Sequence, residues 1–160
     1  MLAIIRRAVV FAALLLVLTA SFSFAEGKLN FIEHFTQGQQ ELAVLTFYDP
    51  AQKKGDDRAG LIGIATPERN SFAFNGAEWD ELIALCDKAA KVQSDSWTEV
   101  GSLTEHRTSD VSHMTVSAGP GMKIVISSAN SGTVSYTLEK KDVPRLQSGL
   151  QKVKTFLAEK

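Results

Sequence analysis

The stretch that decides the fold is Phe74-Asn75-Gly76-Ala77-Glu78-Trp79-Asp80-Glu81-Leu82, where alternating apolar residues give way to a helical pattern. The chain repeats this transition 64 residues later, as Leu138-Glu139-Lys140-Lys141-Asp142-Val143-Pro144-Arg145-Leu146. In the same alignment Cys86 corresponds to Leu150, and Ala89 to Val153. The sequence therefore predicts, twice, a strand that runs directly into an amphipathic helix.

Both helices have start signals. Asn75 can cap the first free amides of one helix, and Glu78 completes a capping-box pair, which predicts a helix over residues 77–91. The second helix has an apolar stripe at Val143, Leu146, Leu150, Val153 and Leu157 and is expected to end near residue 158. Because proline is tolerated only in a first turn, Pro144 places its cap at or near Asp142.

Runs with strand composition come before each helix, and short turns rich in Gly, Pro, Asn and Asp separate them. The predicted strands are Leu29–Thr36, Glu41–Tyr48, Gly60–Ala65, Asn70–Phe74, Trp97–Glu105, Val111–Ser117, Met122–Ser127 and Thr133–Leu138. Loops this short join antiparallel neighbours. We therefore expect one α+β domain over residues 26–160, built from two tandem ββββα pseudo-repeats (26–93 and 94–160). Each antiparallel meander is expected to be covered by the helix at its own C-terminal end.

The alternation within the strands predicts which faces are buried. Met122, Ile124 and Ile126 share one side of a strand, and the same pattern recurs at Val134, Tyr136 and Leu138 and at Phe72 and Phe74. These side chains are expected to form the cores beneath the helices. Ser71, Ser127, Ser135 and Thr137 lie on the other sides, so a polar sheet face is predicted as the largest candidate surface for a partner.

Two strand-strand-strand-strand-helix units in tandem resemble the arrangement in the purine-rich-element-binding and single-strand-binding transcription-cofactor families. The resemblance covers the order of elements and no sequence motif, and it implies a possible shape. Those families place basic and aromatic side chains on the sheet to hold a nucleic-acid strand. This chain has Ser and Thr there and is acidic overall, so no nucleic-acid partner is expected.

The first 25 residues have the pattern of a secretory leader. Arg6 and Arg7 come before the apolar run Ala8–Leu18, and Ser23-Phe24-Ala25 offers small residues for a signal peptidase. We therefore expect a cleaved signal peptide over residues 1–25, a periplasmic or secreted protein, and no membrane association after cleavage. The alternative is a retained anchor, because no charge occurs from Ala8 to Ala25.

The charge and the cysteine content of the chain narrow the classes of protein to which it can belong. The leader carries two of the 17 basic residues and none of the 18 acidic ones, which leaves the exported chain with a net charge of −3. A protein that binds the phosphate groups of nucleic acid normally has a stripe of Lys and Arg residues on its surface. The sequence of this chain shows no such stripe. Cys86 is the single cysteine, so no internal disulfide forms. Its helical register beside Leu82 and Ala90 predicts a buried, inert thiol.

One constellation could support metal chemistry. His106, Asp110 and His113 lie close together in the sequence, at the ends of two neighbouring predicted strands, and two imidazoles with a carboxylate are suitable ligands for zinc or copper. Glu105 and Arg107 equally fit an ordinary charged turn, and no HExxH or paired-cysteine motif is present. No catalytic, cofactor-binding or metal-binding residue is therefore assigned, and no cofactor is expected.

These observations predict a small exported binding or interaction protein without catalysis, acting in the periplasm or cell envelope on an unidentified protein or small molecule. Its oligomeric state is left open. The alternative is a secreted hydrolase or metal-binding protein that uses the His106/Asp110/His113 hairpin. The two differ in one feature: an enzyme needs a concave pocket where several of His34, Glu105, His106, Asp110 and His113 converge.

Overall fold

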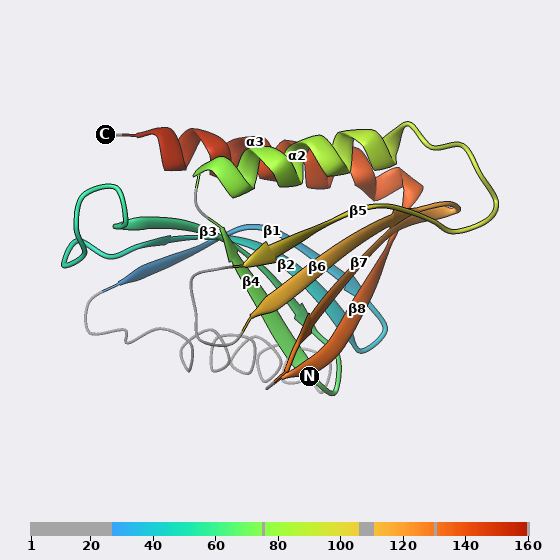
Figure 1. The fold of residues 1–160 in the computed structure, drawn as a ribbon, viewed down its shortest axis with the longest axis horizontal. Coiled ribbons are helices and arrows are strands. Elements are labelled where there is room, and N and C mark those ends of the chain that lie inside the picture. Colours follow the sequence, from blue (N-terminus) through green and yellow to red (C-terminus); the bar gives the residue numbers. More distant parts are fainter. Residues whose placement is uncertain (1–26, 75, 106–110, 130, 160) are drawn as a thin grey trace, which may run out of the picture.

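The computed structural model describes residues 27–74, 76–105, 111–129 and 131–159, and every structural statement below concerns these residues. They form a mixed α+β fold with two four-stranded antiparallel sheets and two long helices (Figure 1). The first sheet contains β1 (Lys28–Gln37), β2 (Gln40–Tyr48), β3 (Arg58–Ala65) and β4 (Arg69–Phe74). The second contains β5 (Thr98–Glu105), β6 (Ser112–Ala118), β7 (Gly121–Ser128) and β8 (Gly132–Glu139).

Each sheet is a simple meander in which consecutive strands are neighbours. Helix α2 (Gly76–Ala90) follows the first sheet, and a short 3-10 turn, η1 (Lys140–Asp142), leads from the second sheet into α3 (Val143–Ala158). All eight predicted strands and both helices are present, each within two residues of its predicted bounds. Pro144 lies in the first turn of α3, with Asp142 at the cap position. Among the described residues, no helix has the length and apolarity needed to cross a membrane.

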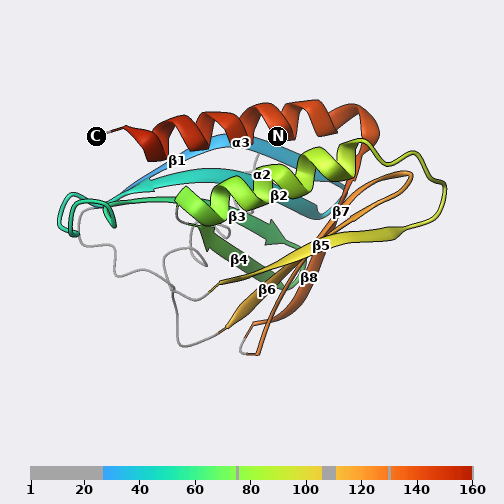
Figure 2. The same cartoon turned by 45° about the horizontal axis from the view of Figure 1, so that its top comes forward.

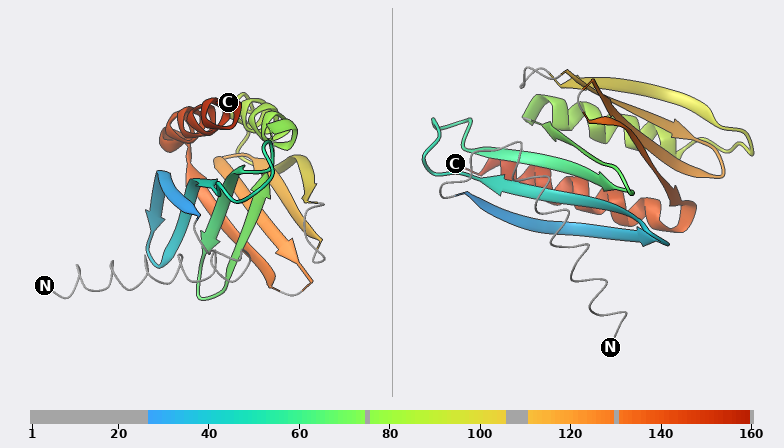
Figure 3. Two further views of the ribbon diagram at one scale, coloured as in Figure 1. Left: turned by 90° about the vertical axis from the view of Figure 1, so that its left-hand side faces the viewer. Right: turned by 90° about the horizontal axis from the view of Figure 1, so that it is seen from below.

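The pairing of helices with sheets differs from the predicted one. Helix α2 begins beside β4 and packs on β5 and β6 of the second sheet, whereas α3 packs on β1, β2 and β3 of the first sheet. The two helices lie side by side above both sheets, as Figures 2 and 3 show. Because β4 is the edge strand that contacts the second sheet, a helix that follows it directly starts at the boundary and continues over the neighbouring sheet.

One core joins both sheets and both helices. The strand faces predicted to be buried are buried, including Phe72, Ile124 and Val134. Trp79 of α2 lies at the centre: it is 0% exposed, its Nε1 donates a hydrogen bond of 2.7 Å to the Leu150 carbonyl, and its ring meets Phe74 edge-on. The helices and the two sheets thus share a single apolar interior, and the predicted role of Trp79 as an anchor is confirmed.

Polar contacts connect parts of the chain that are distant in sequence. Glu33 of β1 accepts a hydrogen bond of 2.8 Å from Arg145 of α3 and pairs with Lys152 at 3.3 Å. Asn70 Nδ2 of β4 donates to the Gly132 carbonyl of β8 at 3.2 Å, which links the two sheets. The Glu33 contacts hold α3 across the first sheet, and the Asn70 contact holds the two sheets together.

Candidate functional site

The residues proposed for metal chemistry do not form a site in the described part of the chain. His113 lies in β6, and its Nδ1 is 3.0 Å from the hydroxyl of Thr104 on β5. His106 and Asp110 lie outside the described residues, so the predicted three-residue constellation remains a prediction. Within the described ranges, no three His, Cys, Asp or Glu side chains are grouped closely enough to hold a metal ion.

The remaining candidate acids and bases are dispersed. His34 lies in β1 of the first sheet, where its Nε2 is 3.2 Å from the Glu41 carboxylate. Glu105 ends β5 of the second sheet and is buried. None of the three cavities described below is lined by His34, Glu105 or His113. These three cavities therefore do not bring His34, Glu105 and His113 together.

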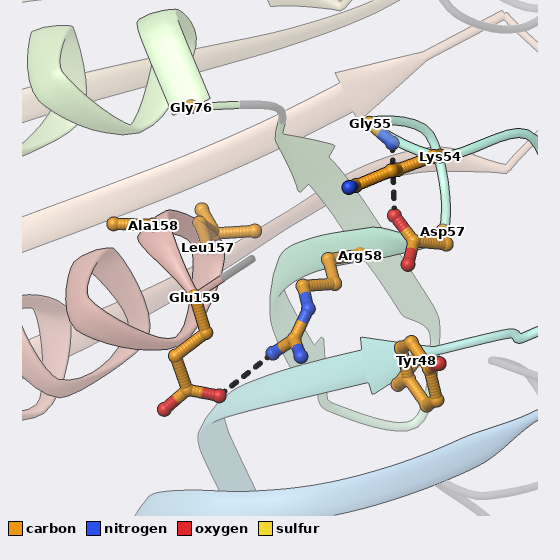
Figure 4. Close-up of a pocket in the computed structure, with 9 residues that line it drawn as sticks. All are labelled: Tyr48, Lys54, Gly55, Asp57, Arg58, Gly76, Leu157, Ala158 and Glu159. Atoms are coloured by element: carbon orange, nitrogen blue, oxygen red, sulfur yellow. Dashed lines mark hydrogen bonds and ion pairs between the residues drawn. The ribbon is translucent and has the colours of Figure 1, made fainter.

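A polar cavity of about 540 Å³ lies between the β2–β3 loop and the end of α3 (Figure 4). The Arg58 guanidinium donates to the Phe156 carbonyl at 3.0 Å and to Glu159 at 2.8 Å. It also stacks over the rings of Phe156 and Tyr48, at 4.6 and 5.1 Å. The contacts of Arg58 fasten the end of α3 to β3, which is a structural role.

A second concave region lies at the opposite end of the molecule, beside the β6–β7 turn. Its two adjoining cavities, of about 410 and 220 Å³, share Gly121 and Lys140. Trp97 lines the larger cavity and is 45% exposed. Lys141 on the rim pairs with Glu139 at 2.6 Å.

The first sheet has a second apolar face, turned away from the helices, which we call the outer face. Its large side chains lie on neighbouring strands in register, with Leu29 opposite Phe47, Phe31 opposite Leu45, and Leu45 opposite Leu61. Small residues continue the face toward β4. With Leu29 and Phe31 packed against it, the cluster consists of Ala43, Leu45, Phe47, Ala59, Leu61, Ala65 and Ala73.

The outer face is separate from the main core. Its cluster contains only residues of β1 to β4, while both helices and the second sheet contribute to the other cluster. Seen from below in Figure 3, β1, β2 and β3 lie in front of α3, and no other described element lies in front of them. Leu45 is nevertheless 0% exposed and Leu61 1% exposed. No described helix or strand outside the first sheet contributes a residue to this cluster.

The corresponding face of the second sheet has the opposite character. It carries Thr115, Lys123, Val125, Ser127, Ser135 and Thr137, all partly exposed. This is the polar face predicted as the main surface for a partner, and the polar alternation in these strands is confirmed. The apolar outer face of the first sheet was not predicted. Its signal is the nearly continuous apolar content of residues 42–47, interrupted only by Thr46, and of residues 61–65, since a strand buried on both faces loses its polar alternation.

Cys86 provides a test of core packing. Burial, with a smaller contribution from Asp87, raises the pKa of its thiol from an ordinary value of 9.0 to about 12. We expect no reaction with a maleimide at pH 7.5 in the folded protein and one reactive thiol in denaturant. From about pH 9 upward, the Cys86 thiol ionises in the unfolded state but not in the folded state. The free energy of unfolding should therefore fall as the pH rises from 9 toward 12. Stoichiometric labelling of the native protein would contradict this burial.

No model of a known protein family matches the sequence, and no curated protein shows significant similarity to it.

Proposed function

We propose that this chain is an exported, non-enzymatic interaction protein of the periplasm or cell envelope, and that the outer face of the first sheet is its binding surface. In this proposal residues 1–25 are a cleaved leader, and residues 26–160 form a single domain of two ββββα pseudo-repeats (26–93 and 94–160). The apolar outer face is the observation that carries the proposal.

The size of this face supports a binding role. Four strands lie about 4.8 Å apart, and eight residues of a strand span about 25 Å, so the footprint of the outer face is roughly 400 Å². In this proposal, cleavage of the leader leaves the face open, and the largest apolar patch on a monomeric protein is of about this size and is often a binding site. At about 25 cal/mol per Å², covering a wholly apolar area of this size would contribute about 10 kcal/mol, which is an upper bound because the face also carries polar residues toward one end.

The length of the remaining chain explains why the cover must come from another molecule after export. Cleavage after Ala25 leaves, outside the described ranges, Glu26 and four short pieces, of which the longest is residues 106–110. Five fully extended residues reach at most about 18 Å. A segment of that length cannot cover four strands, so in this proposal the cover of the exported chain is supplied by a partner.

An interaction function also agrees with the chemistry of the described surface. In the cavity beside the end of α3, Arg58 is paired with Glu159. Among the described residues, the candidate acids and bases are divided between the two sheets. The outer face, by contrast, is mainly apolar. Its polar groups lie near one end, where His34 pairs with Glu41. Such a surface recognises another apolar surface rather than a small polar substrate.

Photo-crosslinking in the native cell envelope tests this proposal. A photoreactive phenylalanine analogue at Phe47 on the outer face is expected to give a protein adduct, because a partner covers this position. The matched control carries the same analogue at Val125, on the polar face of the second sheet, and should give none. N-terminal sequencing of the same material tests cleavage after Ala25. Adducts at neither position, or equal adducts at both, would contradict the proposal.

A further inference from the structure

We propose that the partner on the outer face is a second copy of this chain, packed face to face as a sheet sandwich. This inference rests on the proposed function, because it requires the same face and a cleaved leader. It is carried by the distribution of large and small side chains over the face, by the position of its charges, and by the polar surface of the second sheet.

The outer face is made of rows that run across the strands. Next to the row of Leu29, Phe47 and Ala59 lies a second row with Phe31, Leu45, Leu61 and Ala73, in which each residue is the registered partner of the next. The third row contains His34, Ala43, Gly63 and Ser71. Large apolar side chains thus fill one end of the face, and small ones the next part along the strands.

This order of sizes is self-complementary. A two-fold axis that lies along the second row places Leu45 of one copy over Leu45 of the other. The same rotation places the Phe47 row of one copy over the Ala43 row of the other, so on β2 the large side chain of Phe47 meets the small side chain of Ala43. Sheets packed in this way lie about 10 Å apart, with the side chains of the two faces interlocking between them.

In this dimer the charged residues Glu41 and Arg69 lie at the margin of the contact and not at its centre. Glu41 and Arg69 belong to a fourth row, at the end of the strands beyond Ala43, and the axis leaves that row at the margin of the contact. His34, which pairs with Glu41, lies on the edge strand β1 and keeps 23% of its side chain exposed. No charge is therefore buried at the centre of the sandwich, where it would oppose association.

The second sheet limits the assembly to two copies. Its outer face carries Thr115, Lys123, Ser135 and Thr137, so in the described part of the chain only the first sheet offers an apolar outer face. One self-complementary face per chain produces a closed dimer rather than an open filament. A footprint of roughly 400 Å² per copy is small for a permanent dimer, which predicts reversible association at micromolar concentrations.

Sedimentation of the exported protein from 1 to 100 µM tests the inference. We expect a monomer–dimer equilibrium, with the dimer dominant at the upper concentration. Leu45→Asp and Ala73→Arg should each weaken the association at least about 100-fold, because both place a charge on the second row. Val125→Asp, on the polar face, should leave it unchanged. Circular dichroism shows whether each variant is folded, and two independent variants guard against the misfolding of one.

The outcomes separate the two proposals. A dimer that both outer-face variants dissociate, while Val125→Asp does not, supports the second copy. A monomer at 100 µM that still crosslinks another protein through position 47 overturns the second copy and leaves the interaction function standing. A monomer without any adduct overturns both. A purified chain that begins at Met1 also overturns the second copy, because residues 1–25 would then be available as a cover.

Discussion

Replacing Trp79 with alanine is expected to lower the free energy of unfolding by about 3 to 5 kcal/mol, which is among the largest effects available in this chain. The side chain is completely buried between the helices and the first sheet, and its ring packs edge-on against Phe74 at a centroid distance of 5.2 Å. The variant also leaves the Leu150 carbonyl without the 2.7 Å hydrogen bond that the indole donates. A cavity and the loss of a buried hydrogen bond thus act together, although the Leu150 carbonyl keeps its helical hydrogen-bond partner within α3.

Urea unfolding followed by circular dichroism measures this effect, since the variant removes a fluorophore. Trp97→Ala is the matched control: the same substitution at a residue that is 45% exposed should cost no more than about 0.5 kcal/mol. Trp79→Phe separates the two causes, because it keeps most of the packing but loses the indole donor. Similar losses for Trp79→Ala and Trp97→Ala would show that Trp79 does not anchor the core as described.

Replacing Gly60 with valine is expected to destabilise the fold by more than the 1 to 3 kcal/mol typical of overpacking. Even the first carbon of a side chain at this position would lie 2.6 Å from two ring atoms of Trp79 and 2.7 Å from Cγ1 of Val153. These neighbours belong to α2 and α3, which both rest on β3 here. The larger side chain therefore pushes both helices away from the sheet.

The control for this substitution is Gly76→Ala, at the first residue of α2, where an added carbon meets nothing within 4 Å. Alanine is the better helix former, so this variant should be neutral or slightly more stable. Thermal unfolding of both variants gives the comparison. A Gly60→Val protein with unchanged midpoint would mean that the helices do not pack against β3 as closely as the structure places them.

Much of the fold could be predicted because local chemistry determines it. The Asn75-Gly76 transition, the turns around Asp49-Pro50 and Gly119-Pro120-Gly121, and Pro144 in a first turn mark where elements begin and end. Strand and helix bounds followed from these signals and from apolar periodicity. Side-chain alternation also identified the faces of β7 and β8 that the core buries.

The pairing of helices with sheets could not be predicted in this way. Periodicity shows that α2 has an apolar stripe through Leu82 and Cys86, but the stripe is equally suited to either sheet. What decides the pairing is the position of β4, whose edge contacts the second sheet and whose chain continues after one residue into α2. That contact joins residues far apart in sequence, and no local pattern encodes it.

The candidate binding surface was missed for a different reason. Polar alternation in β8 predicts a solvent-facing side of the second sheet, whereas the runs Leu42–Phe47 and Leu61–Ala65 lack that alternation and no second apolar face was predicted from them. A strand with apolar residues on both sides needs two covers, and the helices supply one of them. The sequence thus contained the signal for the outer face, but the need for a partner followed only from the arrangement of the helices.

The most direct test of the central claim uses a single cysteine on the proposed two-fold axis. Ala73→Cys in the exported protein should be joined to a second copy by a short bis-maleimide, because facing sheets lie about 10 Å apart and Cys86 is too deeply buried to react. Ser135→Cys, on the polar face of the second sheet, should remain uncrosslinked under the same conditions. A covalent dimer from Ala73→Cys alone is the predicted result. Equal crosslinking at both positions, or none at Ala73→Cys, would contradict the account.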